Sequence, residues 1–369
     1  MTLLISVGEL SGDVYASKII KEIHRRHPQW RIAVLGGNLS RKAGAELLAD
    51  TVSLATFGLW ELLATLRRWK GVWDASRRWI MENQPNLVII IDNPGFNLRL
   101  GRFCYQRGVP VICFVPPQVW AWGAKRARTL AQVTERILTL FPWEGAHFTR
   151  WEGRAEWVGH PLTRLVPELA YFTDPSHREK IVFLPGSRRR ELLAFLRVLA
   201  PLLPALAKRW KGMEMAMVLS NPDFREIITR ILPAHPLTLY EHGSRYEALR
   251  GARLCMTTCG TVTLEVAFAG IPQIIVYRVS ALTYRIGRLL LKQRFFGLPN
   301  IIMGREVAPE LIQHTFTVQN ALRAMEGILE DRDQRQQEAW RLATELRETL
   351  SFGDPFDNVV RVIEELYDE

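Results

Sequence analysis

Residues 180–191 read Lys-Ile-Val-Phe-Leu-Pro-Gly-Ser-Arg-Arg-Arg-Glu, an apolar run followed by a small-residue turn and the polar start of a helix. The same order recurs at residues 254–265, where the apolar run leads through Cys259-Gly260 into Thr261. A buried strand that ends in a tight turn and leads into a helix is typical of parallel α/β sheets. Ligands bind such sheets at the carboxyl ends of the strands. The two stretches therefore predict a doubly wound domain whose strand ends form a binding site.

The residues of these turns suit a nucleotide sugar. Free N–H groups at a helix N-terminus favour an anion, and Arg188 can add a bidentate phosphate contact. Glu265 lies about one helical turn beyond Thr261 on the same side of the helix, where its carboxylate can accept both hydroxyls of a ribose. Both charged residues could instead be ordinary helix-surface side chains, but the small residues before them favour the ligand. Those small residues complete the predicted donor site: Gly186, Ser187 and Gly260.

Length and composition limit the classes of protein. A chain of 369 residues with 48% hydrophobic residues is long enough for two α/β domains. It has no apolar run of about 18 residues and no basic leader, so we expect neither a membrane span nor a signal peptide. The four cysteines lack the spacing of a zinc site, and the acidic pair in 331–333 lies on a polar helix. We therefore expect a cytoplasmic protein with no metal and no cofactor.

The net charge of +10 requires a partner. Nucleic acid is the usual partner of so basic a chain, but the basic residues are dispersed and no nucleic-acid motif is present. An anionic membrane surface or a phosphorylated substrate explains the charge equally well. Residues 56–79 favour the membrane, because they combine tryptophans with Arg and Lys around an apolar helical stripe. The residues predicted to contact the membrane are Phe57, Leu59, Trp60, Leu62, Leu63, Leu66 and Trp69. The alternative is that this stripe packs on the sheet.

Short apolar runs alternate with helical patterns in both halves of the chain. The predicted strands are 3–7, 31–35, 87–91, 109–115 and 136–140 in the first half, and 180–184, 215–219, 237–240, 254–257 and 273–276 in the second. The rhythm breaks around 159–162, and prolines follow. We predict two facing, doubly wound, Rossmann-like α/β domains at 1–165 and 179–350, with a linker at 166–178. The last helix, 356–369, could pack on the first domain or on a partner subunit, which leaves a homodimer open.

Three stretches of the first half supply candidate site residues. The turn Gly8-Glu9-Leu10-Ser11-Gly12-Asp13 joins the first strand to the first helix, and it lacks the dinucleotide-binding pattern. Either Ser11 or Asp13 could simply cap the helix. Asp92 follows the apolar run 87–91, at the edge of the sheet where ligands bind. A turn aspartate that caps the next helix is an equally good interpretation of this position. Trp120 and Trp122 lie in a loop and can stack on a sugar, although one of two such tryptophans more often belongs to the core.

Taken together, the order and spacing of these motifs resemble the lipid-A-disaccharide synthase family. The match runs from Val7 to about Gln313. Its blocks are Gly8-Glu9, Ser11-Gly12-Asp13, Ile91-Asp92, Pro94, Phe96-Asn97, Val119-Trp120-Ala121-Trp122, Val158-Gly159-His160-Pro161, Leu184-Pro185-Gly186-Ser187-Arg188, Gly260-Thr261, Thr263-Leu264-Glu265, Tyr277-Arg278, Leu298-Pro299-Asn300 and Gly304-Arg305-Glu306.

The resemblance implies an inverting glycosyltransferase of GT-B fold. It would join UDP-2,3-diacylglucosamine to 2,3-diacylglucosamine 1-phosphate at the inner membrane surface, without a metal, giving the β-1,6 disaccharide phosphate and UDP. Asp92 matches the family's essential aspartate, which we expect to be the general base, and Arg188 matches its essential arginine. Asn300 and Glu306 match polar residues of the donor-side loop. The residues expected to contact the acceptor are Glu9, Ser11, Gly12, Asp13 and Trp120.

Departures from the family pattern fall in the first half. Gly95 stands where the family has a second aspartate, and Pro116 and Gln118 stand where it has serines. A related transferase with another lipid acceptor is therefore an alternative. Two further alternatives are an enzyme of the UDP-sugar 2-epimerase kind, for which no acid/base set is evident, and a non-catalytic basic protein that binds membrane or nucleic acid.

Overall fold

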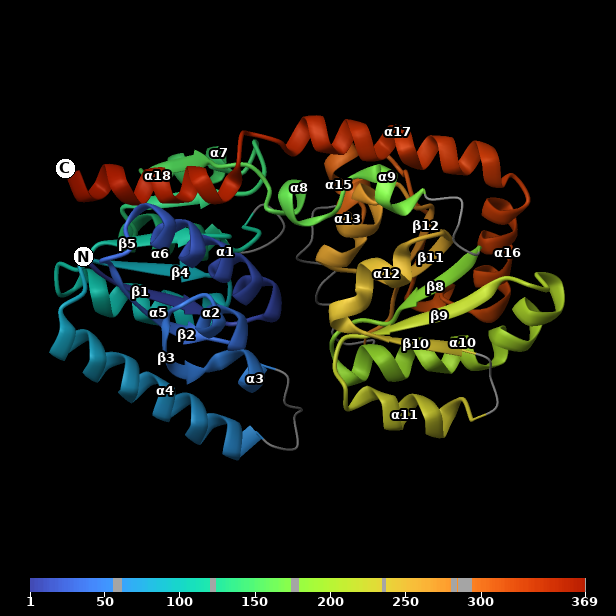
Figure 1. Cartoon of the computed structure of the whole chain (residues 1–369), viewed down its shortest axis with the longest axis horizontal. Helices are drawn as coiled ribbons and strands as arrows, with labels where there is room; N and C mark the ends of the chain where they lie inside the picture. The colour runs from blue at the N-terminus through green and yellow to red at the C-terminus, as the bar shows by residue number, and fades with distance from the viewer. Residues whose placement is uncertain are drawn as a thin grey trace. The chain divides into compact units, whose positions relative to one another are not determined.

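The computed structural model describes residues 1–55, 62–119, 124–173, 179–233, 237–279, 284 and 294–368. The chain forms two compact units, Met1–Pro161 with Leu350–Glu369, and Leu162–Thr349. Each unit has one sheet in which all the paired strands run parallel, of seven strands in the first unit and six in the second. Helices cover the sheets, so the predicted pair of doubly wound α/β domains is confirmed (Figure 1).

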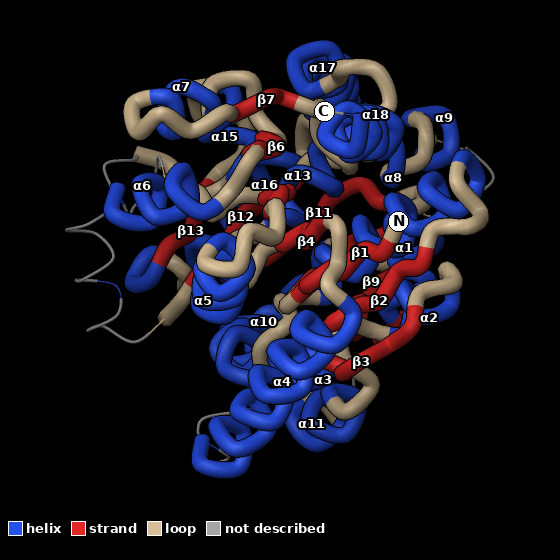
Figure 2. The backbone as a smooth tube through the Cα atoms, turned by 90° about the vertical axis from the view of Figure 1, so that its left-hand side faces the viewer, coloured by secondary structure: helices blue, strands red, loops and turns tan. Residues whose placement is uncertain are grey.

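The first unit is built on a sheet with the strand order β3-β2-β1-β4-β5-β6-β7. Its strands are β1 (Thr2–Val7), β2 (Arg31–Gly36), β3 (Glu46–Asp50), β4 (Leu87–Ile91), β5 (Val111–Phe114), β6 (Arg136–Thr139) and β7 (Ala155–Trp157). Its helices are α1 (Leu10–Arg26), α2 (Asn38–Lys42), α3 (Thr51–Ala55), α4 (Leu62–Asn83), α5 (Pro94–Tyr105), α6 (Ala124–Val133), α7 (Gly145–Thr149) and α18 (Pro355–Asp368). Figure 2 shows α1 and α2 on one side of β1 and β2, with α4 and α5 on the other.

Continuous apolar runs explain the central strands of this sheet. Every residue of β4 is buried, as expected for a strand covered by helices on both faces. The described part of α4 adds Val72, Trp79 and Ile80 to the core on the α4–α5 face. The helix α18 packs on α1, where Arg26 forms ion pairs with Asp357 and Glu364. The end of the chain therefore belongs to the first unit.

The second unit is built on a sheet with the strand order β10-β9-β8-β11-β12-β13. Its strands are β8 (Lys180–Leu184), β9 (Glu214–Leu219), β10 (Leu237–Glu241), β11 (Ala252–Thr258), β12 (Gln273–Tyr277) and β13 (Glu310–Ile312). Its helices are α8 (Leu162–Leu165), α9 (Leu169–Phe172), α10 (Arg189–Arg209), α11 (Phe224–Ile231), η2 (His242–Ser244), α12 (Arg245–Leu249), α13 (Thr261–Phe268), α15 (Leu298–Met303), η3 (Gln313–Thr315), α16 (Val318–Leu329) and α17 (Arg332–Leu350).

Strand register determines which turns meet at the sheet edges. In the first unit Val7 pairs with Ile91, so the turns after β1 and β4 start side by side. In the second unit Leu184 pairs with Thr257, so the turns after β8 and β11 are neighbours too. The polar motifs of each unit are therefore gathered at the carboxyl ends of two adjacent central strands, where doubly wound sheets bind ligands.

Candidate active site

The turn after β4 is held in an unusual backbone conformation. Asp92 and Asn93 have φ angles of 52° and 39°, in the left-handed region that non-glycine residues seldom occupy. Such a conformation persists only where the surroundings impose it, and it is often found at functional sites. The backbone N–H of Gly8, at the end of β1, donates to Asp92 Oδ1 at 2.8 Å. The turn thus carries the Asp92 carboxylate across to the neighbouring strand.

Asn97, one turn into α5, stabilises this backbone conformation through hydrogen bonds of its side chain. Its buried amide nitrogen donates to the carbonyl oxygens of Ile91 and Asp92, both at 2.9 Å. Its amide oxygen accepts from the hydroxyl of Ser6 on β1 at 2.6 Å. Asn97 had no predicted role beyond its place in a matched block. A buried amide can be recognised as a clamp only once its partners are known.

The Asp92 carboxylate is placed to take up a proton. Its Oδ2 is enclosed and has no hydrogen-bond partner among the described residues. Burial and the nearby Glu9 carboxylate raise the pKa of Asp92 well above its ordinary value of 3.8, against the N–H groups of Gly8 and Glu9. A β-carbon at Gly12 would lie 2.2 Å from Oδ2, so only glycine fits beside this oxygen. An unpartnered carboxylate with a raised pKa suits a general base.

Asp13 is buried, unlike Glu9 and Ser11 in the same turn, and is hydrogen-bonded to the backbone. It is 1% exposed, and its carboxylate accepts from the backbone N–H groups of Gly37, Leu39 and Ser40 at 2.9–3.2 Å and from the Ser40 hydroxyl. These bonds satisfy the start of α2. The geometry therefore favours a structural role for Asp13 over direct acceptor contact. Glu9 and Ser11, by contrast, are exposed. Trp120 lies outside the described residues.

The turn after β8 is shaped around Gly186. Its φ is +91°, and the Ser220 hydroxyl donates to its carbonyl oxygen at 2.6 Å. A β-carbon at Gly186 would lie 2.6 Å from Glu191 Oε2 and 2.8 Å from Thr258 Oγ1. Both the conformation and the space therefore require glycine. Ser187 follows it and is exposed.

Arg188 is the residue that precedes the first turn of α10. Its side chain is 69% exposed, and Nη1 lies 3.4 Å from Glu191 Oε1. Glu191 also accepts from the Arg188 backbone N–H at 3.3 Å. Glu191 is 13% exposed, but the contact is long and the guanidinium itself is open to solvent, so a phosphate can reach it.

The turn after β11 leaves a helix N-terminus open. Gly260, which precedes α13, is exposed, and no atom lies within 4 Å of the position of a β-carbon there. Thr261 is the first residue of α13 and is half-buried. The first N–H groups of this eight-residue helix have no partner in their own helix, which makes its end a suitable place for an anion.

Glu265 is more buried than its place at the start of a helix suggests. It is 6% exposed, and its Oε2 lies 2.8 Å from Arg245 Nη2. The Tyr246 hydroxyl donates to the same oxygen at 3.3 Å. Burial raises the pKa of Glu265, and the Arg245 charge and the Tyr246 hydrogen bond oppose that rise. Sequence reasoning missed Arg245, because a position 20 residues earlier carries no periodic signal that links it to Glu265.

The loop after α15 is organised by a buried amide. Asn300 is 0% exposed, accepts from the N–H groups of Val307 and Ala308, and donates to Glu310 and to the Ala308 carbonyl, all at 2.7–2.9 Å. This geometry favours a role in shaping the loop over ligand contact. Glu306, at the tip of the same loop, is exposed and remains free to meet a ligand.

The predicted membrane residues are only partly described. Trp69 is half-buried, and its ring lies 5.2 Å from the ring of Phe96 on α5. Trp73 packs on Phe96 and Phe103. This part of α4 therefore packs on its own unit. Phe57, Leu59 and Trp60 lie outside the described residues, as do the side chains of Leu62, Leu63 and Leu66. No helix in the described part of the chain is both long and apolar enough to cross a bilayer.

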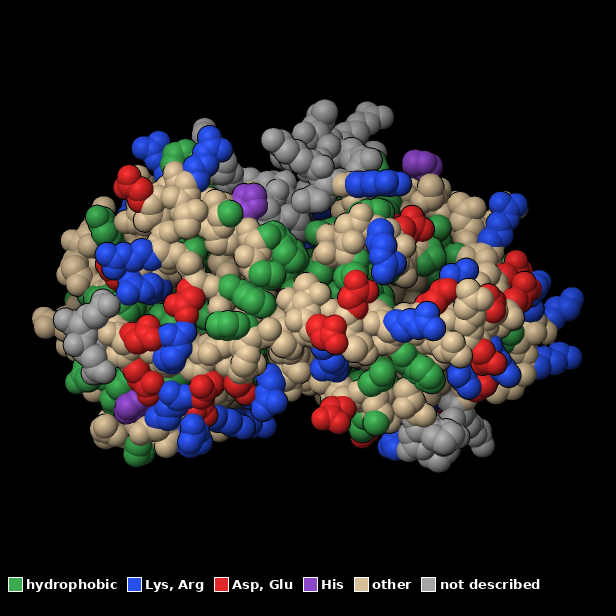
Figure 3. Space-filling model, turned by 90° about the horizontal axis from the view of Figure 1, so that it is seen from above, with side chains coloured by type: hydrophobic (Ala, Val, Ile, Leu, Met, Phe, Trp, Pro, Cys, Tyr) green, Lys and Arg blue, Asp and Glu red, His purple; other side chains and the backbone are tan. Residues whose placement is uncertain are grey.

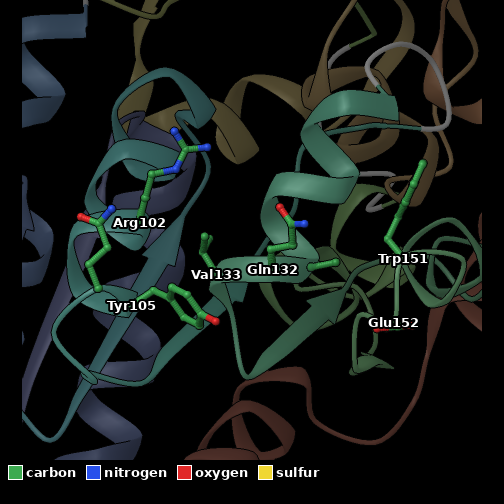
Figure 4. A pocket seen from close by; sticks show the side chains of 8 residues that line it. Arg102, Tyr105, Gln132, Val133, Trp151 and Glu152 are labelled. Carbon is green, nitrogen blue, oxygen red and sulfur yellow. The ribbon is translucent and has the colours of Figure 1, made fainter.

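A separate cavity of about 470 Å³ lies in the first unit, beside the ends of α5 and α6 (Figure 4). It is lined by Arg102, Tyr105, Gln106, Ala131, Gln132, Val133, Trp151 and Glu152. None of the predicted site residues lines it. The cavity lies near the beginnings of β5 and β6, whereas the candidate site lies at the carboxyl ends of β1 and β4.

Comparison with known proteins gives one consistent result. The sequence profile of the family described as lipid-A-disaccharide synthetase matches residues 3–353. A lipid-A-disaccharide synthase of Geobacter sulfurreducens is 33% identical over 320 residues, which cover 84% of this chain and 83% of the relative. That of Geobacter metallireducens is 32% identical over 373 residues, covering 99% and 97%.

Solved structures support the fold. The UDP-GlcNAc 2-epimerase of Neisseria meningitidis has a TM-score of 0.65 at 11% identity and covers 100% of both chains. MurG of Acinetobacter baumannii has a TM-score of 0.57 at 15% identity and covers 99% of both. These similarities confirm the predicted GT-B architecture. Given the match of the family profile along nearly the whole sequence, the chain belongs to the lipid-A-disaccharide synthase family.

Proposed function

We propose that this protein transfers 2,3-diacylglucosamine from UDP to the 6-hydroxyl of 2,3-diacylglucosamine 1-phosphate, giving a β-1,6-linked disaccharide phosphate and UDP. Family membership supports the overall reaction. The observation that carries the chemistry is the Asp92 carboxylate, which is enclosed, unpartnered at Oδ2 and raised in pKa.

The proposed step is a single displacement with inversion. The acceptor 6-oxygen attacks the anomeric carbon, the bond from that carbon to the UDP oxygen breaks, and UDP leaves with the bonding electrons. The hydroxyl proton passes to Asp92 Oδ2. A raised pKa makes the carboxylate a stronger base towards a sugar hydroxyl, and the fixed backbone of the turn holds it in place.

The donor is proposed to bind the turns after β8 and β11. The open N-terminus of α13 and the exposed guanidinium of Arg188 suit the pyrophosphate. Glu265 suits the ribose, and Glu306 can reach the donor from its loop. Several proteins of similar fold are described as bound to UDP or UDP-GlcNAc, which supports a nucleotide sugar as the donor.

The acceptor is proposed to bind near the turn after β1. Glu9 and Ser11 are the exposed polar residues of that turn, and the buried Gly12 packs closely beside Asp92 Oδ2. Asp13 contributes indirectly, because it holds the neighbouring loop of α2. Trp120 is proposed to stack on the acceptor sugar.

Both substrates carry acyl chains, so we propose that the protein works while bound to the anionic inner surface of the membrane. The stripe formed by Leu62, Leu63 and Leu66 is the proposed contact. Exposed Arg67, Arg68 and Lys70 adjoin it and suit anionic headgroups. On the face of the first unit seen in Figure 3, basic and acidic side chains are interspersed.

The direct test is incubation with both acylated substrates. Equal amounts of disaccharide phosphate and UDP are expected, and neither product should form without the acceptor. An epimerase reading has one support, the similarity of fold to UDP-GlcNAc 2-epimerases. An epimerase would invert C2 of UDP-GlcNAc and release no UDP. Chromatography of the nucleotide products distinguishes the two activities. A transferase with another lipid acceptor would release UDP only when given that acceptor.

A further inference from the structure

We propose that Arg245 is a positioning residue that keeps one oxygen of Glu265 available to the donor ribose, and that it thereby sets the preference of the site for ribose over deoxyribose. This inference rests on the proposed function, since it takes the donor to be a UDP-sugar. It assigns to α12 a part in donor recognition, although the sequence motifs lie only on the turns after β8 and β11.

The two carboxylate oxygens of Glu265 have different partners. Arg245 Nη2 at 2.8 Å and the Tyr246 hydroxyl at 3.3 Å both contact Oε2. Oε1 has no partner among the described residues, and it is not one of the fully enclosed unpartnered atoms. One oxygen is therefore fixed by α12 while the other can accept from a ligand hydroxyl. With Oε2 held, the carboxylate cannot rotate freely, so its open oxygen is pre-organised.

Arg245 is held in place by further contacts of its own. Its guanidinium carbon lies 5.3 Å from the centre of the Tyr246 ring, and its Nη1 lies 3.4 Å from His242 Nε2. Burial and the Arg245 charge lower the pKa of His242 to about 4, so this histidine is neutral at physiological pH and accepts from the guanidinium. The Arg245 side chain is only 20% exposed, which limits its alternatives in solvent.

Burial makes the negative charge of Glu265 unfavourable in free energy. Burial alone favours the protonated form of Glu265, and Arg245 is the positive group that opposes this. A protonated carboxyl has lost part of its accepting capacity, because one oxygen then carries hydrogen. Without Arg245, Glu265 would therefore bind the ribose hydroxyls less well, most of all at low pH.

Several other elements lie against α13: β11, β12, α8 and α15, and also Arg347 of α17, which donates to the Phe268 carbonyl at 3.3 Å. Among the described residues, Arg245 is the cation that lowers the pKa of Glu265. Arg253 on β11 pairs with Glu179. The pKa of Tyr277 on β12 is raised by burial and by Glu191 rather than by Glu265. Burial raises the pKa of the Cys255 thiol of β11, so this thiol stays uncharged. The charge state of Glu265 thus depends on α12.

The test is isothermal calorimetry with UDP and 2′-deoxy-UDP at pH 6 and pH 9. For the wild type we expect UDP to bind about tenfold more tightly than 2′-deoxy-UDP at both pH values, the size of one hydrogen bond to a charged group. Arg245→Met should lose this preference, and should lose more of it at pH 6 than at pH 9, because the lower pH favours protonated Glu265. Arg245→Lys should keep it at both pH values, because the charge is retained.

Two controls make the result specific. Arg253→Met removes a similar guanidinium from β11, where it pairs with Glu179, and should leave the preference unchanged. Tyr246→Phe removes only the second hydrogen bond to Oε2 and should reduce the preference by about threefold. It also carries the test if Arg245→Met fails to fold, as judged by circular dichroism.

The possible outcomes separate the two proposals. If Arg245→Met keeps the full preference at pH 6, or if the wild type does not distinguish the two nucleotides, the role of Arg245 is refuted while a UDP site stands. If the wild type binds neither nucleotide, the proposed function fails. A loss of preference that is equal at both pH values would also refute the inference, because it would reflect damage to the site rather than protonation of Glu265.

Discussion

Replacing Asp92 with asparagine tests the proposed general base with little change of shape. The asparagine oxygen can still accept from the Gly8 N–H, as Oδ1 does at 2.8 Å. Its amide nitrogen would occupy the place of Oδ2, which is enclosed beside Gly12. The side chain is then the right size and held by the same bond, but it has lost the group that takes up a proton.

The expected loss follows from the role of the carboxylate. General base catalysis contributes about 10²–10⁴-fold, or about 2.7–5.4 kcal/mol of barrier at roughly 1.36 kcal/mol per tenfold. We expect Asp92→Asn to reduce turnover by at least about 100-fold. UDP affinity should not change, because the donor is proposed to bind the second unit. Product formation with saturating acylated substrates and calorimetry with UDP measure the two effects separately.

A matched control is Asp223→Asn, which neutralises an exposed carboxylate in the second unit and should leave turnover unchanged. Turnover of Asp92→Asn within a fewfold of the wild type would eliminate Asp92 as the base. Glu9, the exposed carboxylate of the neighbouring turn, would then be the next candidate. An equal fall in UDP affinity and turnover would point instead to a general disturbance of the protein.

The same variant makes a prediction about stability and pH. The pKa of Asp92 is raised on folding from an ordinary value of 3.8. Above the ordinary pKa, the folded state binds the Asp92 proton more tightly than the unfolded chain does. The Asp92 carboxyl therefore lowers the free energy of unfolding of the wild type as the pH rises. Asp92→Asn lacks this term. Its free energy of unfolding, measured in urea, should therefore gain on that of the wild type between about pH 4 and neutrality. A constant difference across this range would contradict the raised pKa.

Three other changes probe the remaining parts of the site. Gly12→Ala places a β-carbon 2.2 Å from Asp92 Oδ2, so turnover should fall at least about tenfold with UDP affinity unchanged; normal turnover would show that the carboxylate can move away. Arg188→Ala should weaken UDP binding by about 10–150-fold in calorimetry, as expected for a lost charge-assisted bond, with little change in melting temperature since the side chain is 69% exposed. Serine at Leu62, Leu63 and Leu66 together should reduce binding to anionic vesicles at constant melting temperature, whereas a large fall in melting temperature would place the stripe in the core.

The central strands were predictable because they are continuous apolar runs. Each residue of β4 and β8 is fully buried, so the sequence itself shows where these strands lie. The strands β3, β7 and β13 were missed. They lie at or near the sheet edges, and most of their residues are only half-buried. Edge strands need not be apolar on both faces, and three to five residues give too short a pattern to detect.

The site was predictable in position but not in the role of each polar residue. Strand ends located Asp92 and Arg188, because parallel topology places such residues at one edge. The family resemblance implied ligand contacts for Asp13 and Asn300, yet the structure gives both of them several backbone partners. A carboxylate or amide in a turn is drawn to unsatisfied N–H groups as readily as to a ligand. Only the folded backbone shows which of the two is nearer.

Asp92 and Glu265 show why burial by itself does not determine function. Asp92 lies in a strand-to-helix turn and Glu265 in the helix after such a turn, and burial raises the pKa of both carboxylates. The charged neighbour of Asp92 is Glu9, which raises its pKa further, whereas the neighbour of Glu265 is Arg245, which opposes the rise. The first environment favours proton uptake, as a base requires, and the second favours a lasting negative charge that accepts hydrogen bonds. Opposite neighbours thus suit the two carboxylates to the different roles proposed for them, general base for Asp92 and ribose acceptor for Glu265.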